Sequence, residues 1–193
     1  FFARSHAGVL DEATRKLMNT PRCQLADDVS MQSFKRKRFN ALYGWSKNRL
    51  RYNINNLPTN SYNMQDSSKV HQALATAFKD WSFVADIKFE QSSSDDEADV
   101  NVAFYSRDHG DGNPFDGPGA VLAHSFYPDD GRLHFDDDES WSTNNYGINL
   151  RQVATHEIGH IIGLGHTRVK DAVMYPYYQY SADFKLQSDD IRG

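Results

Sequence analysis

The sequence HEIGHIIGLGH, residues 156–166, decides how the rest of the chain is interpreted. Apolar residues recur around it at helical spacing, so His156 and His160 fall one turn apart on the same face of a predicted helix. Gly163 lets the chain leave that helix with a positive φ and swing back, which brings His166 round as a third imidazole. The stretch therefore predicts a site where three imidazoles bind one metal ion.

Three imidazoles leave the fourth position of a tetrahedral zinc site open, and catalysis needs that position. A zinc-bound water has its pKa lowered to about 7 and becomes a nucleophile near neutral pH. Glu157, next to His156, is placed to take a proton from that water and to pass it to a departing amine. The alternative is an amphipathic helix whose histidines are four residues apart by chance, and Gly163 and His166 argue against it.

The pattern around this stretch predicts the fold class α/β (α+β) with a mixed sheet. Alternation predicts a strand at residues 50–54, and helical spacing predicts a helix that begins near Asp66 or Ser67. Asn149 and Gln152 resemble a capping box at the start of the helix that carries His156. Further elements are expected as a helix at residues 9–18 and strands at residues 87–89, 100–104, 120–126 and 132–135.

Composition narrows the classes of protein that the chain belongs to. With 193 residues, 39% of them hydrophobic, the chain is long enough to bury a full core, and we expect one domain plus an extra segment. The net charge of −5 gives no general attraction to nucleic acid, so no nucleic-acid partner is expected. No apolar run is long enough to span a bilayer, and a membrane anchor outside this stretch is left open. The one cysteine excludes an intrachain disulfide.

Residues 156–166 resemble the zinc motif of the metzincins, H-E-x-x-H-x-x-G-x-x-H. Ala172-Val173-Met174-Tyr175-Pro176 resembles the Met-turn of the matrix metalloproteinases, or matrixins, in which Met174 would form an apolar floor beneath the histidines. This resemblance implies a metzincin-type catalytic domain with a twisted mixed five-stranded sheet, an active-site helix and a Met-turn. It also implies a zinc-dependent endopeptidase of extracellular, matrix-type proteins, which is secreted or extracellular, at the cell surface or in the extracellular matrix.

Metal ions beyond the catalytic zinc are implied by the same resemblance, which gives two zinc ions and at least one calcium ion. A structural zinc would be held by a closed set of four protein ligands: His109, Asp111, His124 and His134. The calcium ligands would be carboxylates and backbone carbonyls from Asp116, Gly117, Gly119, Val121, Asp136 and Glu139. A solvated acidic run and unrelated surface histidines are the alternatives. The sequence departs from the family in the turn between His124 and His134, which is shorter, and this departure argues against the family's second calcium site near Asp99 and Gly131.

The resemblance further implies where extended polypeptide substrates bind. Pro176 and Tyr178 would line the outer wall of the S1′ pocket, which takes an apolar side chain. Leu122 and Ala123 would lie on the edge strand whose backbone pairs with substrate.

The resemblance also implies a latency segment before the catalytic domain. Pro21-Arg22-Cys23 followed by Asp27 resembles the matrixin cysteine switch, in which the thiolate of Cys23 occupies the fourth zinc position. The sequence departs from the family at Gln24-Leu25-Ala26, where the motif runs glycine, a variable residue, proline. A side chain at Gln24 is therefore expected to strain the bend and to weaken the switch.

The basic run Lys35-Arg36-Lys37-Arg38 indicates a processing site for a furin-like protease, with cleavage after Arg38 and a mature chain that begins at Phe39. A nuclear-localisation or heparin-binding patch is the alternative. We expect residues 1–38 to be the C-terminal part of a propeptide and residues 39–193 to be the catalytic domain, with its last helix truncated. Proteinaceous inhibitors of matrixins are expected partners.

Two other functions are compatible with part of this sequence. The first is a noncatalytic zinc- and calcium-binding interaction module, and the retained Glu157 argues against it because a pseudoenzyme commonly loses its base. The second is a different metzincin hydrolase, which Met174-Tyr175-Pro176 and the histidines between His109 and His134 argue against.

Overall fold

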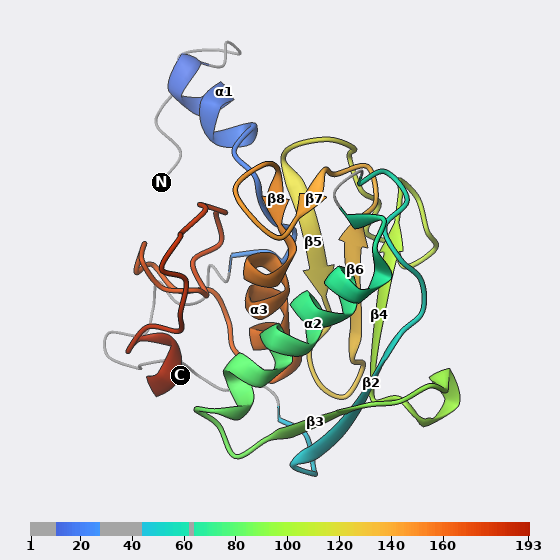
Figure 1. The fold of residues 1–193 in the computed structure, drawn as a ribbon. Coiled ribbons are helices and arrows are strands. Elements are labelled where there is room, and N and C mark those ends of the chain that lie inside the picture. Colours follow the sequence, from blue (N-terminus) through green and yellow to red (C-terminus); the bar gives the residue numbers. More distant parts are fainter. Residues whose placement is uncertain (1–10, 28–43, 62–63) are drawn as a thin grey trace.

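The computed structural model describes residues 11–27, 44–61 and 64–193, and in them a twisted sheet packs against two helices (Figure 1). The expected processing site, Lys35 to Arg38 with Phe39, lies outside the described residues. The elements in chain order are α1 Glu12–Met18, β1 Arg22–Cys23, β2 Arg49–Ile54, α2 Ser67–Ser82, β3 Lys88–Gln91, the 3-10 turn η3 Asp95–Glu97, β4 Val100–Tyr105, β5 Val121–Ser125, β6 Arg132–Asp136, β7 Trp141–Ser142, β8 Ile148–Asn149, α3 Leu150–Ile161 and the 3-10 turn η4 Asp190–Arg192.

The main sheet has six strands in the order β1-β5-β6-β4-β2-β3. Strand β5 runs antiparallel to β6, and every other neighbouring pair in this sheet is parallel, so the predicted mixed sheet is confirmed. Five of these strands come from the part of the chain after residue 44, as predicted. The sixth, β1, comes from the segment before it and pairs with β5 at the edge of the sheet.

Helix α2 covers one face of this sheet. Asp66 caps it by accepting a hydrogen bond from the Ser68 N–H, so the predicted start of the helix is confirmed. Its apolar positions are all buried, and they are Val70, Ala73, Leu74, Ala77, Phe78 and Trp81. The indole N–H of Trp81 donates to the Thr155 carbonyl of α3 over 2.7 Å, which ties the two helices together.

Helix α3 is enclosed by its surroundings, and eleven of its residues are buried. Its cap, Asn149, accepts from the Gln152 N–H, as the capping-box pattern predicts. The return contact of a capping box is not formed. The Gln152 amide instead accepts from and donates to the backbone of Ser181, over 3.1 and 2.6 Å. A tertiary contact has therefore replaced half of the local motif.

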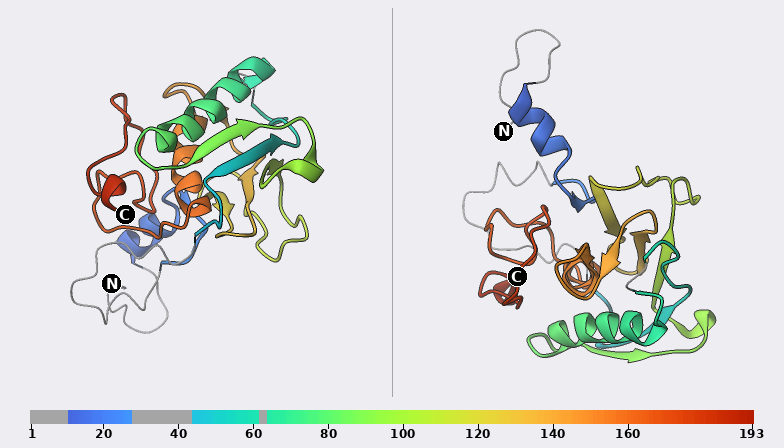
Figure 2. Two further views of the ribbon diagram at one scale, coloured as in Figure 1. Left: turned by 90° about the horizontal axis from the view of Figure 1, so that it is seen from below. Right: turned by 45° about the horizontal axis from the view of Figure 1, so that its top comes forward.

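Helix α1 stands out from the rest of the molecule (Figure 2), and none of its residues is buried. Asp11 caps it, so the helix begins at Glu12 rather than at residue 9 as the sequence suggested. In the described part of the chain, no helix is both long and apolar enough to cross a membrane.

Candidate active site

Three imidazoles meet at one point next to the C-terminal half of α3. His160 Nε2 lies 3.1 Å from His156 Nε2 and 3.2 Å from His166 Nε2, and the last two atoms are 3.2 Å apart. Gly163 has a φ of 105°, and this left-handed residue turns the chain so that His166 returns to the helix. The structure thus brings together the three histidines that the sequence singled out.

The outer nitrogen of each ring fixes the direction of its inner nitrogen. His156 Nδ1 donates to the Val173 carbonyl over 2.6 Å, and His160 Nδ1 donates to the Leu164 carbonyl over 2.7 Å. His166 Nδ1 lies 3.0 Å from a carboxylate oxygen of Asp27 in the segment before the domain. Because carbonyl and carboxylate oxygens accept, each Nδ1 carries the proton and each Nε2 directs its lone pair at the common centre.

This arrangement fits a zinc ion. Two nitrogens bound tetrahedrally to zinc, at bond lengths of about 2.05 Å, lie about 3.3 Å apart, close to the separations seen between these rings. Burial lowers the pKa of His160 and of His166, and the neighbouring imidazoles lower both further. The lowered pKa values of these two rings favour their neutral form, which is the state that binds metal.

Cys23 supplies a fourth donor to the same point. Its Sγ lies 3.6 Å from His160 Nε2, and the sulfur and the three imidazole nitrogens all lie within 4.8 Å of one another. Strand β1 holds it there, because the Cys23 N–H donates to the Pro176 carbonyl over 3.0 Å. Burial raises the pKa of the thiol well above its ordinary value, and the charge of Glu157 raises it further.

Glu157 is fully buried beside this cluster. Its Oε2 accepts a hydrogen bond from Ser125 Oγ over 2.7 Å, and its Oε1 has no hydrogen-bond partner in the described part of the chain. Oε2 of Glu157 is thus fixed by the protein, whereas Oε1 is available to a water or substrate atom bound in the site. Sequence reasoning missed Ser125, because nothing local links a serine of β5 to a helix that begins 25 residues later.

Met174 is wholly buried and packs against α3 at Gly159. A Cβ atom at Gly159 of α3 would collide with its Sδ, so the absence of a side chain there allows the methionine to approach the helix. Asp190 accepts hydrogen bonds from the backbone N–H groups of Val173 and Met174, both over 3.0 Å. This buried carboxylate, which the sequence did not reveal as important, holds the Met-turn in place.

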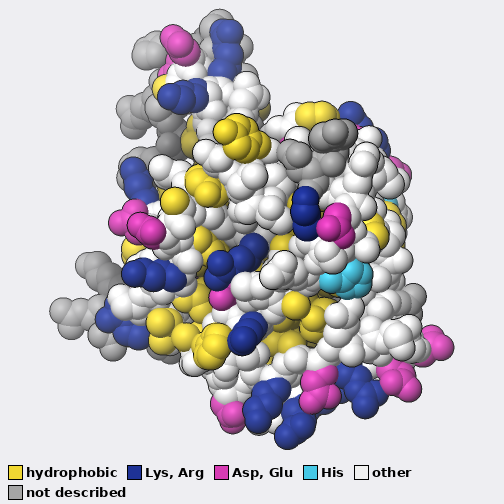
Figure 3. Space-filling view, viewed as in Figure 1, with side chains coloured by type: hydrophobic (Ala, Val, Ile, Leu, Met, Phe, Trp, Pro, Cys, Tyr) yellow, Lys and Arg dark blue, Asp and Glu magenta, His cyan; other side chains and the backbone are white. Residues whose placement is uncertain are grey.

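A cavity of about 440 Å³ opens beside the cluster, and Leu122, Glu157, Pro176 and Tyr178 are among the residues that line it. Ala123, the other residue expected to bind substrate, does not line the cavity, and its carbonyl accepts from the Gln24 N–H over 2.9 Å. On the face that Figure 3 shows, hydrophobic side chains are exposed between basic ones near the middle of the molecule.

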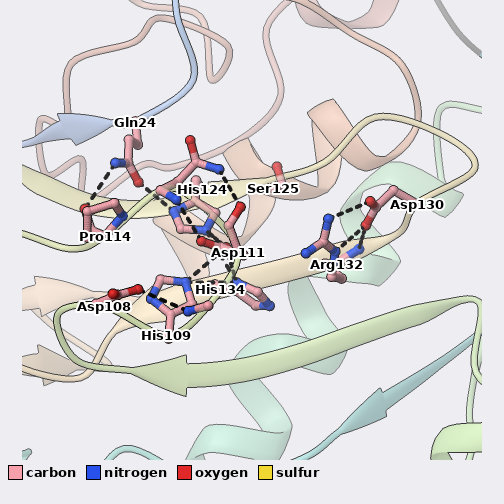
Figure 4. A network of polar contacts seen from close by, with 12 residues as sticks. Gln24, Asp108, His109, Asp111, Pro114, His124, Ser125, Asp130, Arg132 and His134 are labelled. Carbon is pink, nitrogen blue, oxygen red and sulfur yellow. Dashed lines mark hydrogen bonds and ion pairs between the residues drawn. The ribbon is translucent and has the colours of Figure 1, made fainter.

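A second cluster lies around Asp111 (Figure 4). Its Oδ2 is 2.9 Å from His109 Nε2, 2.7 Å from His124 Nε2 and 2.9 Å from His134 Nδ1. Burial lowers the pKa of His124 and lowers that of His134 to about 4. Although burial opposes it, the hydrogen bonds from Asn113 and His124 hold the pKa of Asp111 below its ordinary value. One carboxylate and three imidazoles form a donor set that fits a closed zinc site.

The acidic residues expected to bind calcium lie against the loop at residues 116–121. In that loop, backbone N–H groups of Gly117 and Gly119 donate to Asp136 and Glu139 over 3.2 and 2.6 Å. Asp116 accepts from the Val121 N–H over 3.2 Å. In the part of the chain that the structure describes, the carboxylate oxygens of Asp116, Asp136 and Glu139 do not form a group as close as the metal-binding atoms of the His156 and Asp111 clusters. Burial and the neighbouring carboxylates raise the pKa of Glu139 to about 7.

Asp99 and Gly131, where the sequence argues against a second calcium site, have protein partners. Asp99 accepts from the Arg51 N–H over 2.9 Å and forms an ion pair with Lys47 over 2.7 Å. A Cβ at Gly131 would collide with the Asp99 carbonyl. The short turn therefore packs directly on Asp99.

The bend after Cys23 does not show the strain that was expected. Among the described residues other than glycine, only Arg107 and Ala120 have a positive φ, so Gln24 keeps an ordinary backbone conformation. The Gln24 side chain contacts Pro114 and His124 (Figure 4), and the expected weakening of the switch stays a prediction.

Comparison with known proteins agrees with this geometry. Residues 44–193 match the family described as matrixin. Human matrix metalloproteinase-19 is 42% identical over 190 residues, which are 97% of this chain and 36% of that protein. The hatching enzyme of Paracentrotus lividus is 40% identical over 192 residues, 98% of this chain and 31% of its own length. Human neutrophil collagenase is 39% identical over 202 residues, which cover 100% of this chain and 40% of that protein. The chain thus spans about a third of the length of these relatives.

Proposed function

The chain belongs to the matrixin family, and from this premise we propose that it is a zinc-dependent endopeptidase made in a latent form. The observation that carries the proposal is the convergence of three imidazole lone pairs beside a buried carboxylate with one free oxygen. A purely structural metal site would not need the buried, half-partnered Glu157.

His156, His160 and His166 would hold the catalytic zinc through their Nε2 atoms. A bound zinc ion supplies Lewis-acid activation of water and electrostatic stabilisation of the oxyanion. The protein contributes the direction of the rings, because the Nδ1 atoms of His156 and His160 are committed to backbone carbonyls of the domain, and that of His166 is committed to Asp27 in the uncleaved chain.

Glu157 is the general base in this proposal. Ser125 holds Oε2, so the proton from water would be taken up by Oε1 and then delivered to the amine that leaves. Burial removes bulk water from the carboxylate, so the proton stays close to the reacting atoms during this transfer.

Extended polypeptides are the substrates that the cleft suits best. Segment 21–24 already lies there in extended form: the Arg22 and Gln24 N–H groups donate to carbonyls of Ala120 and Ala123, and the Tyr178 N–H donates to the Pro21 carbonyl. A substrate backbone would use the same edge, at Leu122 and Ala123, and place a side chain in the cavity beside Pro176 and Tyr178. We infer substrates of the extracellular, matrix type, and a secreted or extracellular enzyme.

The latent form would be closed by Cys23, whose thiolate would take the fourth zinc position. Residues 1–38 would be the end of the propeptide and residues 39–193 the catalytic domain, separated by a furin-like protease after Arg38. Proteinaceous inhibitors would act on the same cleft once it is open.

Two further metal sites complete the proposal. The cluster of Asp111 with His109, His124 and His134 would hold a structural zinc. The loop at residues 116–121, with Asp136 and Glu139, would hold calcium, because a cation would offset the burial and the neighbouring negative charges that together raise the pKa of Glu139.

The proposal is tested on the zinc-loaded chain cut after Arg38, with a library of internally quenched peptides. We expect cleavage at internal bonds, preferentially before an apolar residue, loss of activity with a chelator and recovery when zinc is added back. Hydrolysis that a chelator leaves unchanged, or no hydrolysis by fully zinc-loaded cleaved chain, would contradict the proposal.

A further inference from the structure

Gln24 connects the two metal clusters. Its neighbour Cys23 lies in the cluster of His156, while the Gln24 side chain reaches the cluster of Asp111 (Figure 4). Gln24 Oε1 lies 2.6 Å from His124 Nδ1, and Gln24 Nε2 lies 3.2 Å from the Pro114 carbonyl oxygen. The oxygen and the nitrogen of the Gln24 amide therefore each have a hydrogen-bond partner in the domain.

The orientation of this amide follows from its partners. A carbonyl oxygen only accepts, so the amide nitrogen must face Pro114 and the amide oxygen must face His124. The other nitrogen of the His124 ring, Nε2, points at Asp111 Oδ2 over 2.7 Å and would bind the metal there. His124 Nδ1 consequently carries the proton and donates it to Gln24.

The donor that faces Gln24 is held in place by its surroundings. The His124 ring is buried, and Phe115 stacks on it with the ring centres 4.7 Å apart. The Pro114 carbonyl provides an acceptor beside this donor, and such a pair favours a ligand that offers both groups on neighbouring atoms.

We propose that His124 and Pro114 form a carboxamide-binding subsite at the edge of the cleft, and that Gln24 occupies it to anchor the latency segment. The proposal rests on the proposed function, since it concerns the segment that closes the catalytic cluster. Gln24 is a positioning residue: its side chain contacts the cluster of Asp111 and would hold the adjacent Cys23, the last residue of β1, at the catalytic cluster.

A primary carboxamide is the group that fits both partners. An apolar side chain of equal length leaves the His124 donor and the Pro114 acceptor unpaired. A polar site generally rejects a ligand that lacks its hydrogen-bonding groups much more strongly than an apolar site rejects a size change. Gln24→Met tests this directly, because it keeps the length of the side chain and removes both hydrogen bonds.

The experiment measures how fast iodoacetamide alkylates Cys23 in the uncleaved, zinc-loaded chain, with the zinc content determined in parallel. We expect Q24M, and also Q24G, to react about tenfold faster than the wild type at unchanged zinc content, since two hydrogen bonds are lost. The matched control is Q91M, because Gln91 makes a similar contact, 3.1 Å from His71 Nδ1, on β3 far from the cleft. Q91M should react like the wild type.

A second measurement does not depend on the alkylation rate. In chain labelled with nitrogen-15 histidine, the His124 Nδ1–H proton should exchange slowly with solvent in the wild type and at least tenfold faster in Q24M. Equal alkylation rates and equal proton exchange in wild type and Q24M would overturn the subsite and leave the proposed function intact. A wild-type thiol that reacts as fast as a free cysteine in zinc-loaded chain would instead contradict the proposed latency.

Discussion

At the scale of single residues, the site depends on how each polar atom is partnered. Glu157 shows this most clearly: Oε2 is held by Ser125, whereas Oε1 has no partner among the described residues. An unpartnered buried carboxylate oxygen costs free energy, and such a cost is typical of positions whose partner is a substrate or a reacting group.

The Ser125 contact predicts a kinetic effect. In the variant Ser125→Ala the carboxylate loses the hydrogen bond from the Ser125 hydroxyl that fixes its Oε2, so we expect kcat to fall about tenfold with little change in KM. Steady-state kinetics on cleaved, zinc-loaded chain measures this. S82A is the control, because Ser82 bonds the Phe78 carbonyl at the end of α2. An unchanged kcat in S125A would show that packing alone positions Glu157.

At the scale of elements, the second cluster joins pieces of chain that are otherwise unconnected. His124 and His134 face one another on the antiparallel strands β5 and β6, whereas His109 and Asp111 come from the loop after β4. A metal ion bound there would tie the loop to the edge of the sheet, so its binding energy would contribute to stability rather than to chemistry.

We therefore expect Asp111→Ala to release one of two zinc ions and to lower the melting temperature by roughly 10 °C, which corresponds to about 3 kcal/mol in a domain of this size. The catalytic zinc should stay. Metal analysis together with thermal unfolding measures both effects, and D96A, at an exposed position in η3, is the control. Two zinc ions retained in D111A would show that these side chains are not zinc ligands.

Local sequence explains the elements better than it explains the contacts between them. The spacing of apolar residues predicted α2, α3 and the five strands because these signals are local. It did not predict that Gln152 bonds Ser181, that Asp190 holds Met174 or that Gln24 reaches His124, because each contact joins residues distant in sequence. Strands β7 and β8, of two residues each, were also missed, since such short strands carry no alternation.

The candidate site divides in the same way. Spacing within residues 156–166 indicated the three histidines and Glu157, and the resemblance supplied Cys23 and the second cluster. Ser125 and Asp27 carried no such signal. Ser125 orients the Glu157 carboxylate and Asp27 contacts the His166 ring, and residues with such supporting roles stand at no fixed sequence distance from the residue that they orient.

At the scale of the whole molecule, the segment at residues 21–27 packs against the catalytic domain as an added strand of its sheet. It adds a strand to the sheet, places Cys23 at the catalytic cluster and pairs Asp27 with His166. Its removal would expose the cleft, the fourth position at the histidines and the edge of β5 together.

We expect the uncleaved zinc-loaded chain to be inactive and Cys23→Ser to raise its basal activity at least tenfold without cleavage, because a hydroxyl is a much weaker zinc ligand than a thiolate. X-ray absorption at the zinc edge should find a sulfur neighbour at about 2.3 Å in the wild type and none after cleavage, provided that the second cluster contributes only nitrogen and oxygen. A shell of nitrogen and oxygen alone in the uncleaved chain would rule out the thiolate switch.

The most direct test of the central claim combines a rate with a metal count in the variant Glu157→Ala, cut after Arg38. Only the proton carrier is removed, since Glu157 is not one of the metal-binding residues. The account predicts two zinc ions per chain, an unchanged melting temperature within a few degrees and a peptidase rate lower by about three orders of magnitude or more. Near-normal turnover in a variant that keeps both zinc ions would contradict it.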